Sequence, residues 1–274
     1  MKKTTRIETA KDTLRTIEKG FYNLPTGERV EIYEAQTTAE KNTVFYASEV
    51  LDTLLQNFVP NTTYATSYQV TQQTTIEGLL SLSVNNFEKI GVLNFASAKN
   101  AGGGFLGGAH AQEESLARSS GLYGCLLKAP TYYELHRSMK SCLYTDSMIY
   151  APQVPFFKDD DGNYLPCLYK ADVLTSPAVN AGVVRQREFN NVPEIIPATR
   201  LRMQKLLMLL AQNGCTDVIL GAWGCGVFQN VPSEIAMLFH ECLEGQFKGV
   251  FRQVLFAIKS DKATMLNPFE KRFL

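Results

Sequence analysis

Apolar residues recur every three to four positions near the start of the chain, and this spacing predicts an amphipathic helix that ends at Gly20. The residues on its apolar face are Ile7, Ala10, Leu14 and Ile17. Two short apolar runs within 21–33 surround Pro25-Thr26-Gly27, a pattern typical of a hairpin. We interpret residues 1–62 as an N-terminal accessory region beside a core of residues 63–274.

From Thr66 onward, short apolar runs alternate with amphipathic stretches. Strands are predicted over 67–72, 89–96, 147–152, 171–179, 215–223 and 249–258. Helices are predicted over 74–82, 112–129, 197–214 and 231–245. Strands that are apolar throughout and separated by helices are typical of a parallel or mixed sheet with both faces covered. We therefore predict the α/β class, as a three-layer sandwich in which helices flank a mixed, mostly parallel sheet.

The first glycine-rich loop follows the predicted strand 89–96 and contains five glycines within seven residues, 102–108. Glycines let a backbone approach a ligand closely and present its N–H groups. The loop leads into Gln112, Glu113 and Glu114 in the first turn of a helix. Acidic residues there also suit the helix dipole, so simple capping explains them equally well when they are taken alone. The dense glycine run favours a ligand site.

Two nucleotide-binding motifs are disfavoured in this loop. Gly102, Gly104 and Gly107 fit G-x-G-x-x-G formally, but no acidic residue lies between Glu114 and Glu134 to bind a ribose. A phosphate-binding loop of the Walker type is excluded because no Gly-Lys-Ser/Thr follows.

The second glycine-rich loop, residues 221–232, lies between a predicted strand and a predicted helix. A strand, a glycine loop and a helix N-terminus together form a ready anion site that suits a diphosphate. The alternative is a tight turn with Trp223 packed inside. Cys225 has no Cys–His pairing signature, so we interpret it as a small loop side chain. Asp159–Asp161 reads as a solvated turn, since a calcium loop needs a longer pattern of oxygens.

Charge and composition limit the partners. Lys+Arg and Asp+Glu are equal at 27 each, so no global field favours nucleic acid or acidic membranes. A polyanion would have to be held by local N–H groups, and we expect no direct DNA binding, no metal and no cofactor. The opening residues lack the apolar region of a signal peptide, and no run is long enough for a membrane span. We expect a cytoplasmic monomer with reduced cysteines.

Both loops resemble those of the microbial-type poly(ADP-ribose) glycohydrolases, a branch of the macrodomain fold. The signature of that family is three glycines, a six-to-eight-residue spacer and Gln-Glu-Glu. Here Gly102–Gly104 precede seven residues and then Gln112-Glu113-Glu114. The segments N-F-A-S-A-K-N-A, S-L-A-R-S-S-G-L-Y, V-L-T-S-P-A-V-N-A-G and W-G-C-G-V-F are also similar to the family. The likeness is strong over 90–127 and 170–232 and weaker over the first 70 residues.

The resemblance implies an enzyme with a macrodomain-like core that cleaves ribose–ribose O-glycosidic bonds of poly(ADP-ribose) and releases ADP-ribose. It implies that Glu114 is the catalytic acid and base and that Glu113 binds the adjoining ribose. The resemblance also implies the substrate-binding residues. Asn94 would lie near the terminal ribose, Gln112 would bind the sugars, and the first loop would contribute Gly102, Gly103 and Gly104. The diphosphate would be surrounded by Gly224, Cys225, Gly226, Val227 and Phe228, and Phe228 would also press the ribose into place. Relatives often have glycine where this chain has Gln229. No residue matches the adenine-stacking tyrosine of the animal enzymes, for which Tyr150, Phe157 and Tyr169 are candidates.

Neighbouring helical residues point about 100° apart, so Glu113 and Glu114 do not form an acid–base pair across one bond. A single glutamate that first donates a proton and then activates water fits this geometry better. Such an acid needs a raised pKa, which burial of Glu114 against Phe105 and Phe228 would have to supply. Two alternatives stay open: a hydrolase of mono-ADP-ribosylated proteins or nucleobases, and a module that binds ADP-ribose without turnover.

Overall fold

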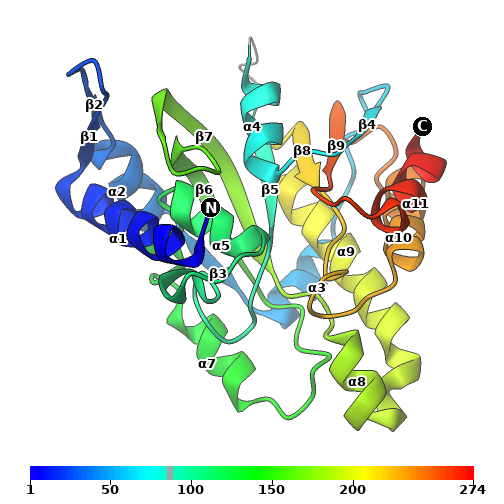
Figure 1. The fold of residues 1–274 in the computed structure, drawn as a ribbon. Coiled ribbons are helices and arrows are strands. Elements are labelled where there is room, and N and C mark those ends of the chain that lie inside the picture. The colour runs from blue at the N-terminus through cyan, green and yellow to red at the C-terminus, as the bar shows by residue number, and fades with distance from the viewer. Residues whose placement is uncertain (85–88) are drawn as a thin grey trace.

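A seven-stranded sheet with helices on both faces forms the body of the protein, which a computed structural model describes for residues 1–84 and 89–274 (Figure 1). The strands are β1 (Phe21–Asn23), β2 (Arg29–Glu31), β3 (Val44–Tyr46), β4 (Ser67–Thr71), β5 (Ile90–Phe95), β6 (Met148–Lys158), β7 (Tyr164–Ser176), β8 (Asp217–Leu220) and β9 (Gln253–Ala257). Their order in the main sheet is β3-β6-β7-β5-β8-β9-β4, and β1 and β2 form a separate hairpin. The pairs β3–β6 and β6–β7 are antiparallel and the others are parallel, which confirms a mixed, mostly parallel sheet.

Eleven α-helices and two short 3₁₀ helices are present in the described residues. They are α1 (Lys3–Lys19), α2 (Tyr33–Lys41), α3 (Ser48–Gln56), α4 (Thr75–Ser83), η1 (Phe105–Gly107), α5 (Gln112–Ser119), α6 (Leu122–Leu126), α7 (Pro130–Ser138), α8 (Ala181–Arg187), η2 (Phe189–Glu194), α9 (Ile195–Gln212), α10 (Pro232–Glu244) and α11 (Ala263–Phe273). None of the helices within 1–84 and 89–274 combines the length and the apolar character that a membrane span requires.

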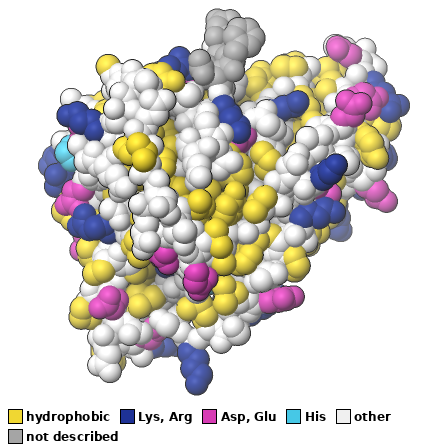
Figure 2. Space-filling view, turned by 180° about the vertical axis from the view of Figure 1, so that it is seen from behind, with side chains coloured by type: hydrophobic (Ala, Val, Ile, Leu, Met, Phe, Trp, Pro, Cys, Tyr) yellow, Lys and Arg dark blue, Asp and Glu magenta, His cyan; other side chains and the backbone are white. Residues whose placement is uncertain are grey.

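Successive side chains of the strands pack into two separate apolar cores, one on each face of the sheet. In β5, Leu93 packs with α3, α9, α10 and α11, whereas its neighbour Val92 packs with α2, α4, α5, α6 and α7. This alternation follows from the two-residue period of a strand, and it confirms the three-layer arrangement. On the rear face of the molecule, charged side chains of both signs are scattered among apolar ones (Figure 2).

The predicted helix over 112–129 is wrong in one respect, because it is divided into α5 and α6. Ser120 is extended (φ −147°, ψ 176°) and forms an isolated antiparallel bridge with Phe156 of β6. The amide of Gly121 donates to the carbonyl of Pro155 at 2.9 Å. These contacts take the backbone out of its helical hydrogen-bonding pattern, and the sequence of the segment does not reveal them.

The other predicted strands and helices are present, with shifted ends. α1 ends at Gly20, whose left-handed backbone (φ 78°) lets its amide bond to the carbonyl of Thr16. The polar turn after Lys158 joins β6 and β7 as a hairpin. The predicted division at residue 62 stays a prediction, but β3, from the first 62 residues, is one of the two edge strands of the main sheet.

A buried ionic network ties α9 to the segments before β6 and after β7. Asp146 accepts from Arg202 Nε at 2.9 Å and from Lys205 Nζ at 2.7 Å, and both cations are 1% exposed. The Arg202 guanidinium also donates to the carbonyls of Pro177 and Leu143, at 2.8 and 2.9 Å. Burial would raise the pKa of Asp146, but the two cations outweigh it and hold that pKa below its ordinary value.

Replacing Asp146 with alanine is expected to lower the free energy of unfolding by about 3 kcal/mol or more, because it removes the shared carboxylate from two buried cations. Urea denaturation followed by circular dichroism measures the change. The matched variant Asp261→Ala removes an exposed carboxylate and should change stability by less than about 0.5 kcal/mol. Equal effects of the two variants would contradict the importance of the network.

Candidate functional site

The two glycine-rich loops lie at the same edge of the sheet, because β5 and β8 are parallel neighbours and each loop follows the carboxyl end of its strand. The first loop runs from Phe95 to α5. The second runs from Leu220 to α10. Ligands of open α/β sheets bind at this edge, so the placement agrees with the sequence prediction.

Glu113 is buried between β5 and the first loop, with 3% of its surface exposed. One carboxylate oxygen accepts from the Ser97 amide at 2.6 Å, and the other from Asn94 Nδ2 at 3.4 Å. Asn94 Nδ2 also donates to Thr175 Oγ1 on β7. Asn94 Oδ1 and Ser176 Oγ are buried at this edge and have no hydrogen-bond partner among the described residues, so each keeps an unused hydrogen-bonding position.

Burial raises the pKa of Glu113 to about 8, although the bonds from Ser97 and Asn94 oppose the shift. Glu113 is therefore mainly neutral at pH 7, which limits its repulsion with Glu114 beside it. The expectation of a buried Glu114 is wrong: Glu114 is only partly buried, and the burial falls on Glu113. Phe105 packs away from the site, against Ala10 and Ala117.

One carboxylate oxygen of Glu114 accepts a hydrogen bond from the glycine run 102–104. Its Oε1 accepts from the Gly104 amide at 2.9 Å. A Cβ added to Gly103 would lie 2.3 Å from the same oxygen and 3.1 Å from Glu113 Oε2. Gly102 and Gly103 also have left-handed φ values of 66° and 59°. Glycine is thus required here both for its conformation and for the close approach of the two carboxyl groups.

Gln112 connects α5 to β5 and α4 through its side-chain amide. Its Oε1 accepts from the Phe95 amide at 2.9 Å, and its Nε2 donates to the Leu93 carbonyl at 2.8 Å and to Thr75 Oγ1 at 3.2 Å. Both donor hydrogens are thereby used within the protein. Only an acceptor position on Oε1 is left for a ligand.

The second loop holds Trp223 inside and presents backbone amides outside. Trp223 is fully buried and donates to the Ser176 carbonyl at 3.3 Å, so the tight-turn interpretation is correct for this side chain. Gly224 is left-handed, and Asn230 Nδ2 donates to its carbonyl at 3.1 Å. The amides of Gly226 and Val227 have no acceptor among the described residues, nor has that of Phe228. Successive open amides of this kind suit a diphosphate.

Cys225 and Val227 contribute to this loop mainly through their backbone. The Cys225 thiol is buried, and burial raises its pKa to about 12, which makes it a poor nucleophile. The Val227 side chain is 83% exposed and packs on nothing that would fix a ligand.

Phe228 lies opposite a second aromatic ring, that of Tyr144, with ring centroids 6.2 Å apart. Tyr144 and Gln229, which follows Phe228, both have left-handed backbones, with φ values of 58° and 55°. Non-glycine residues adopt this conformation at a cost, and hydrogen bonds hold them there. Arg185 donates to the Gln229 carbonyl at 2.9 Å. Gln229 therefore follows the path that glycine would take.

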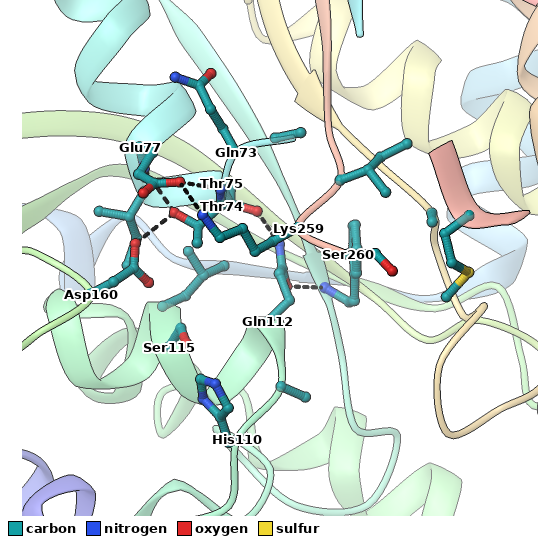
Figure 3. Close-up of a pocket in the computed structure, with 18 of the residues that line it drawn as sticks. Gln73, Thr74, Thr75, Glu77, His110, Gln112, Ser115, Asp160, Lys259 and Ser260 are labelled. Carbon is teal, nitrogen blue, oxygen red and sulfur yellow. Dashed lines mark hydrogen bonds and ion pairs between the residues drawn. The ribbon is translucent and has the colours of Figure 1, made fainter. Parts of the chain in front are cut away.

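A cavity of about 590 Å³ adjoins both loops (Figure 3). Its walls come from the start of α4, from His110 and Gln112, from the β6–β7 turn, and from Lys259 and Ser260 after β9. Thr74 caps α4, accepting from the Glu77 amide, and donates to Asp160 across the cavity wall. None of the adenine-stacking candidates lines the cavity. Tyr150 and Phe157 are core residues, and Tyr169 packs against the apolar core beneath α2 and α7.

Sequence reasoning missed several residues that the fold brings to the site. These are Ser97, Tyr144, Thr175, Ser176 and Asn230, together with the cavity residues Thr74, Asp160 and Ser260. Ser97 and Ser176 stand within the quoted segments that resemble the family, so these segments carried a usable signal. The three cavity residues come from three distant parts of the chain, and the sequence around them gave no such signal.

Comparisons with known proteins agree with this geometry. The family model for the microbial-type poly(ADP-ribose) glycohydrolase (PARG) catalytic domain matches residues 10–159. The chain is 39% identical to a crystal structure of PARG from Thermomonospora curvata, with a TM-score of 0.94 and coverage of 98% of this chain and 100% of that chain. The same relative bound to the inhibitor ADP-HPD is 38% identical, with a TM-score of 0.91 and the same coverage.

The chain is also similar to a relative from a second organism. PARG from Deinococcus radiodurans in complex with ADP-ribose is 40% identical, with a TM-score of 0.82 and coverage of 86% of this chain and 96% of that chain. No curated protein matches the chain.

The raised pKa of Glu113 predicts a specific pH dependence of stability. Between the ordinary glutamate value of 4.5 and about 8, the folded protein keeps a proton that the unfolded chain has released. The free energy of unfolding should therefore fall as pH rises through this window, by roughly 1 kcal/mol per pH unit from this group. Denaturation of the wild type and of Glu113→Gln at pH 5, 6, 7 and 8 measures the effect.

Glu113→Gln removes the titration, so its stability should exceed that of the wild type by an increasing margin toward pH 8. Other groups titrate equally in both proteins and cancel in the difference. Parallel curves for the two proteins would show that Glu113 ionises at an ordinary pH.

Proposed function

The chain belongs to the microbial-type poly(ADP-ribose) glycohydrolases, glycoside hydrolases that cleave ribose–ribose O-glycosidic bonds and release ADP-ribose, and we propose that Glu114 is the general acid and base of this reaction. The observation that carries the proposal is the packing of the Glu114 carboxylate against Gly103, with its Oε1 held by the Gly104 amide. Its other oxygen accepts no hydrogen bond among the described residues, so that oxygen can serve the substrate.

Proton transfer then follows in two steps. The Glu114 carboxyl donates its proton to the leaving ribose oxygen as the bond between that oxygen and the anomeric carbon breaks. The positive charge that develops on the sugar is stabilised by the Glu114 carboxylate. That carboxylate then takes a proton from a water that attacks the anomeric carbon, which completes hydrolysis and restores the acid.

Glu113 and Asn94 supply the binding surface for the ribose in this proposal. Glu113, mainly neutral at pH 7, can exchange hydrogen bonds with a ribose hydroxyl without adding charge beside the diphosphate. The carbonyl oxygen of Asn94, which is buried and has no hydrogen-bond partner among the described residues, accepts a bond from a second hydroxyl. Phe228, opposite Tyr144, packs on the sugar face.

The diphosphate and the adenosine half of the substrate would bind to features next to the ribose site. The open amides of Gly226, Val227 and Phe228 hold the diphosphate, and Gly102–Gly104 line the ribose side. Gln112 positions α5, since its amide is bonded to β5, and its contribution to the sugars is limited to its free acceptor. The adenosine half takes the cavity, which Ala222 and Phe95 connect to both loops.

The finer expectations about partners and location remain proposals. The enzyme acts on poly(ADP-ribose) or on ADP-ribosylated proteins, as a cytoplasmic monomer without direct binding of DNA. Equal numbers of acidic and basic residues support the absence of a DNA-binding field. Light scattering and a DNA titration test the oligomeric state and the binding of DNA.

Replacing Glu114 with glutamine is expected to lower kcat for ADP-ribose release from purified poly(ADP-ribose) by about 10²–10⁴-fold, because the proton donor is lost. The affinity for ADP-ribose, measured by calorimetry, should change little, since the amide keeps the shape of the side chain. Chromatography of the released nucleotide measures turnover.

Glu134→Gln is the matched control, because Glu134 is exposed on α7 and its carboxylate forms no hydrogen bond or ion pair with either loop among the described residues. It should keep wild-type kcat. Turnover of a mono-ADP-ribosylated peptide in preference to the polymer would favour a mono-ADP-ribosyl hydrolase. Binding of ADP-ribose by the wild type without turnover of either substrate would leave a binding module.

A further inference from the structure

The N-terminal helix α1 lies directly against the first glycine loop (Figure 1). Gly108, at the end of η1, has a left-handed φ of 73°. A Cβ at this position would lie 2.8 Å from the Lys3 carbonyl oxygen and 2.9 Å from Ile7 Cγ1. The loop and the helix therefore meet backbone to backbone, with no space for a side chain between them.

Two arginines hold successive peptide groups at this contact. Arg6 of α1 donates from Nε to the Gly108 carbonyl at 2.8 Å. Arg118 of α5 donates from Nη1 to the Ala109 carbonyl at 2.8 Å. Since each carbonyl has its own charged donor, the end of the loop is fixed from both sides.

These two peptide groups connect to Glu114 through a continuous chain of hydrogen bonds. The Ala109 amide donates to the Gly104 carbonyl at 3.2 Å, and the Gly104 amide donates to Glu114 Oε1 at 2.9 Å. A shift of the Gly108–Ala109 backbone would thus move the peptide groups on either side of Gly104, and with them the carboxylate.

Burying the Arg118 guanidinium without an ion pair among the described residues costs free energy of folding, which indicates that the arginine pair has a role beyond packing. Arg118 is 1% exposed, its Nε has no partner among the described residues, and burial lowers its pKa. Arg6 lies near enough to add repulsion, whereas Glu114 and Asp160 are the acidic groups that face it. A buried cation that is held by backbone carbonyls and not by an ion pair costs stability, whatever position it fixes.

The helix is itself firmly anchored, so it can fix the loop. Lys158 of β6 is fully buried and donates to Asp12 Oδ2 at 2.7 Å and to Thr13 Oγ1 at 3.1 Å. Thr13 in turn donates to the Arg118 carbonyl. Ala10 packs with Phe105 and Ala117 in a small buried cluster between helix, loop and α5.

We propose that Arg6 is a positioning residue for catalysis, which holds the Gly104–Ala109 segment so that Glu114 keeps its place. Helix α1 would then contribute to the active site by supplying the residue that positions the loop. The inference rests on the proposed role of Glu114, but the structural effect that it predicts does not.

The first test compares Arg6→Ala, Arg6→Lys and Lys11→Ala, where Lys11 is an exposed cation on the same helix. Arg6→Ala should lower kcat for ADP-ribose release about tenfold or more, since small displacements of catalytic groups have effects of this size. KM and the affinity for ADP-ribose should stay within about twofold, because Arg6 itself lines neither the cavity nor the second loop and reaches the cavity only through its hydrogen bond to the Met1 carbonyl. Arg6→Lys, which keeps one donor, should retain more kcat than Arg6→Ala, and Lys11→Ala should match the wild type.

A fall in kcat that Lys11→Ala shares, or an equal loss of ADP-ribose affinity in Arg6→Ala, would overturn the proposal, since either outcome indicates general destabilisation. Unchanged kcat in Arg6→Ala would overturn it as well. Thermal denaturation of each variant checks that the fold is retained at the assay temperature.

Hydrogen exchange tests the same proposal without any assay of activity. In Arg6→Ala the amides of Gly104 and Ala109 should lose protection by about tenfold relative to the wild type, while those of β5 keep theirs. Unchanged protection at both amides would overturn the proposal. If the wild type fails to release ADP-ribose, the proposed function fails, and the exchange result still decides whether Arg6 holds the loop.

Discussion

The site depends on the close approach of one glycine peptide to two carboxyl groups. At Gly103 even a methyl group would overlap the Glu114 carboxylate and crowd that of Glu113. The backbone can occupy this space only because it has no side chain and can take a left-handed conformation there. Everything that fixes the loop, from Ser97 on one side to Gly108 on the other, therefore fixes the two glutamates as well.

Burial places the two glutamates in different environments. Glu113 is enclosed by β5 and the loop, so desolvation keeps it mainly neutral at pH 7 despite two hydrogen-bond donors. Glu114, one residue later on the helix, points to a partly open position. The 100° turn between neighbouring helical residues is enough to place one carboxyl in the interior and the other beside the substrate space.

The second loop offers backbone amides, and not basic side chains, to a negatively charged group. Its path is fixed from inside by Trp223 and Asn230, and this leaves the amides of three successive residues facing outward. The chain has no net charge, and in the proposed function these local dipoles bind the diphosphate. Left-handed Tyr144 and Gln229 beside Phe228 show that strain is also concentrated at this edge.

Local patterns in the sequence determined the sheet class, the ends of α1 at Gly20 and of α9 near Gly214, and the two glycine loops, because these depend on neighbouring residues. The Gly-Gly-Gly and Gln-Glu-Glu spacing likewise pointed to two segments that the structure brings into contact, while the catalytic role of the glutamates stays a proposal. Only the tertiary structure decided that Ser120 breaks the helix, since its partner Phe156 lies far along the chain. Only the tertiary structure decided which glutamate is buried, what forms the cavity, and that Arg6 reaches the first glycine loop. Burial and long-range contacts come from packing, which a local pattern does not encode.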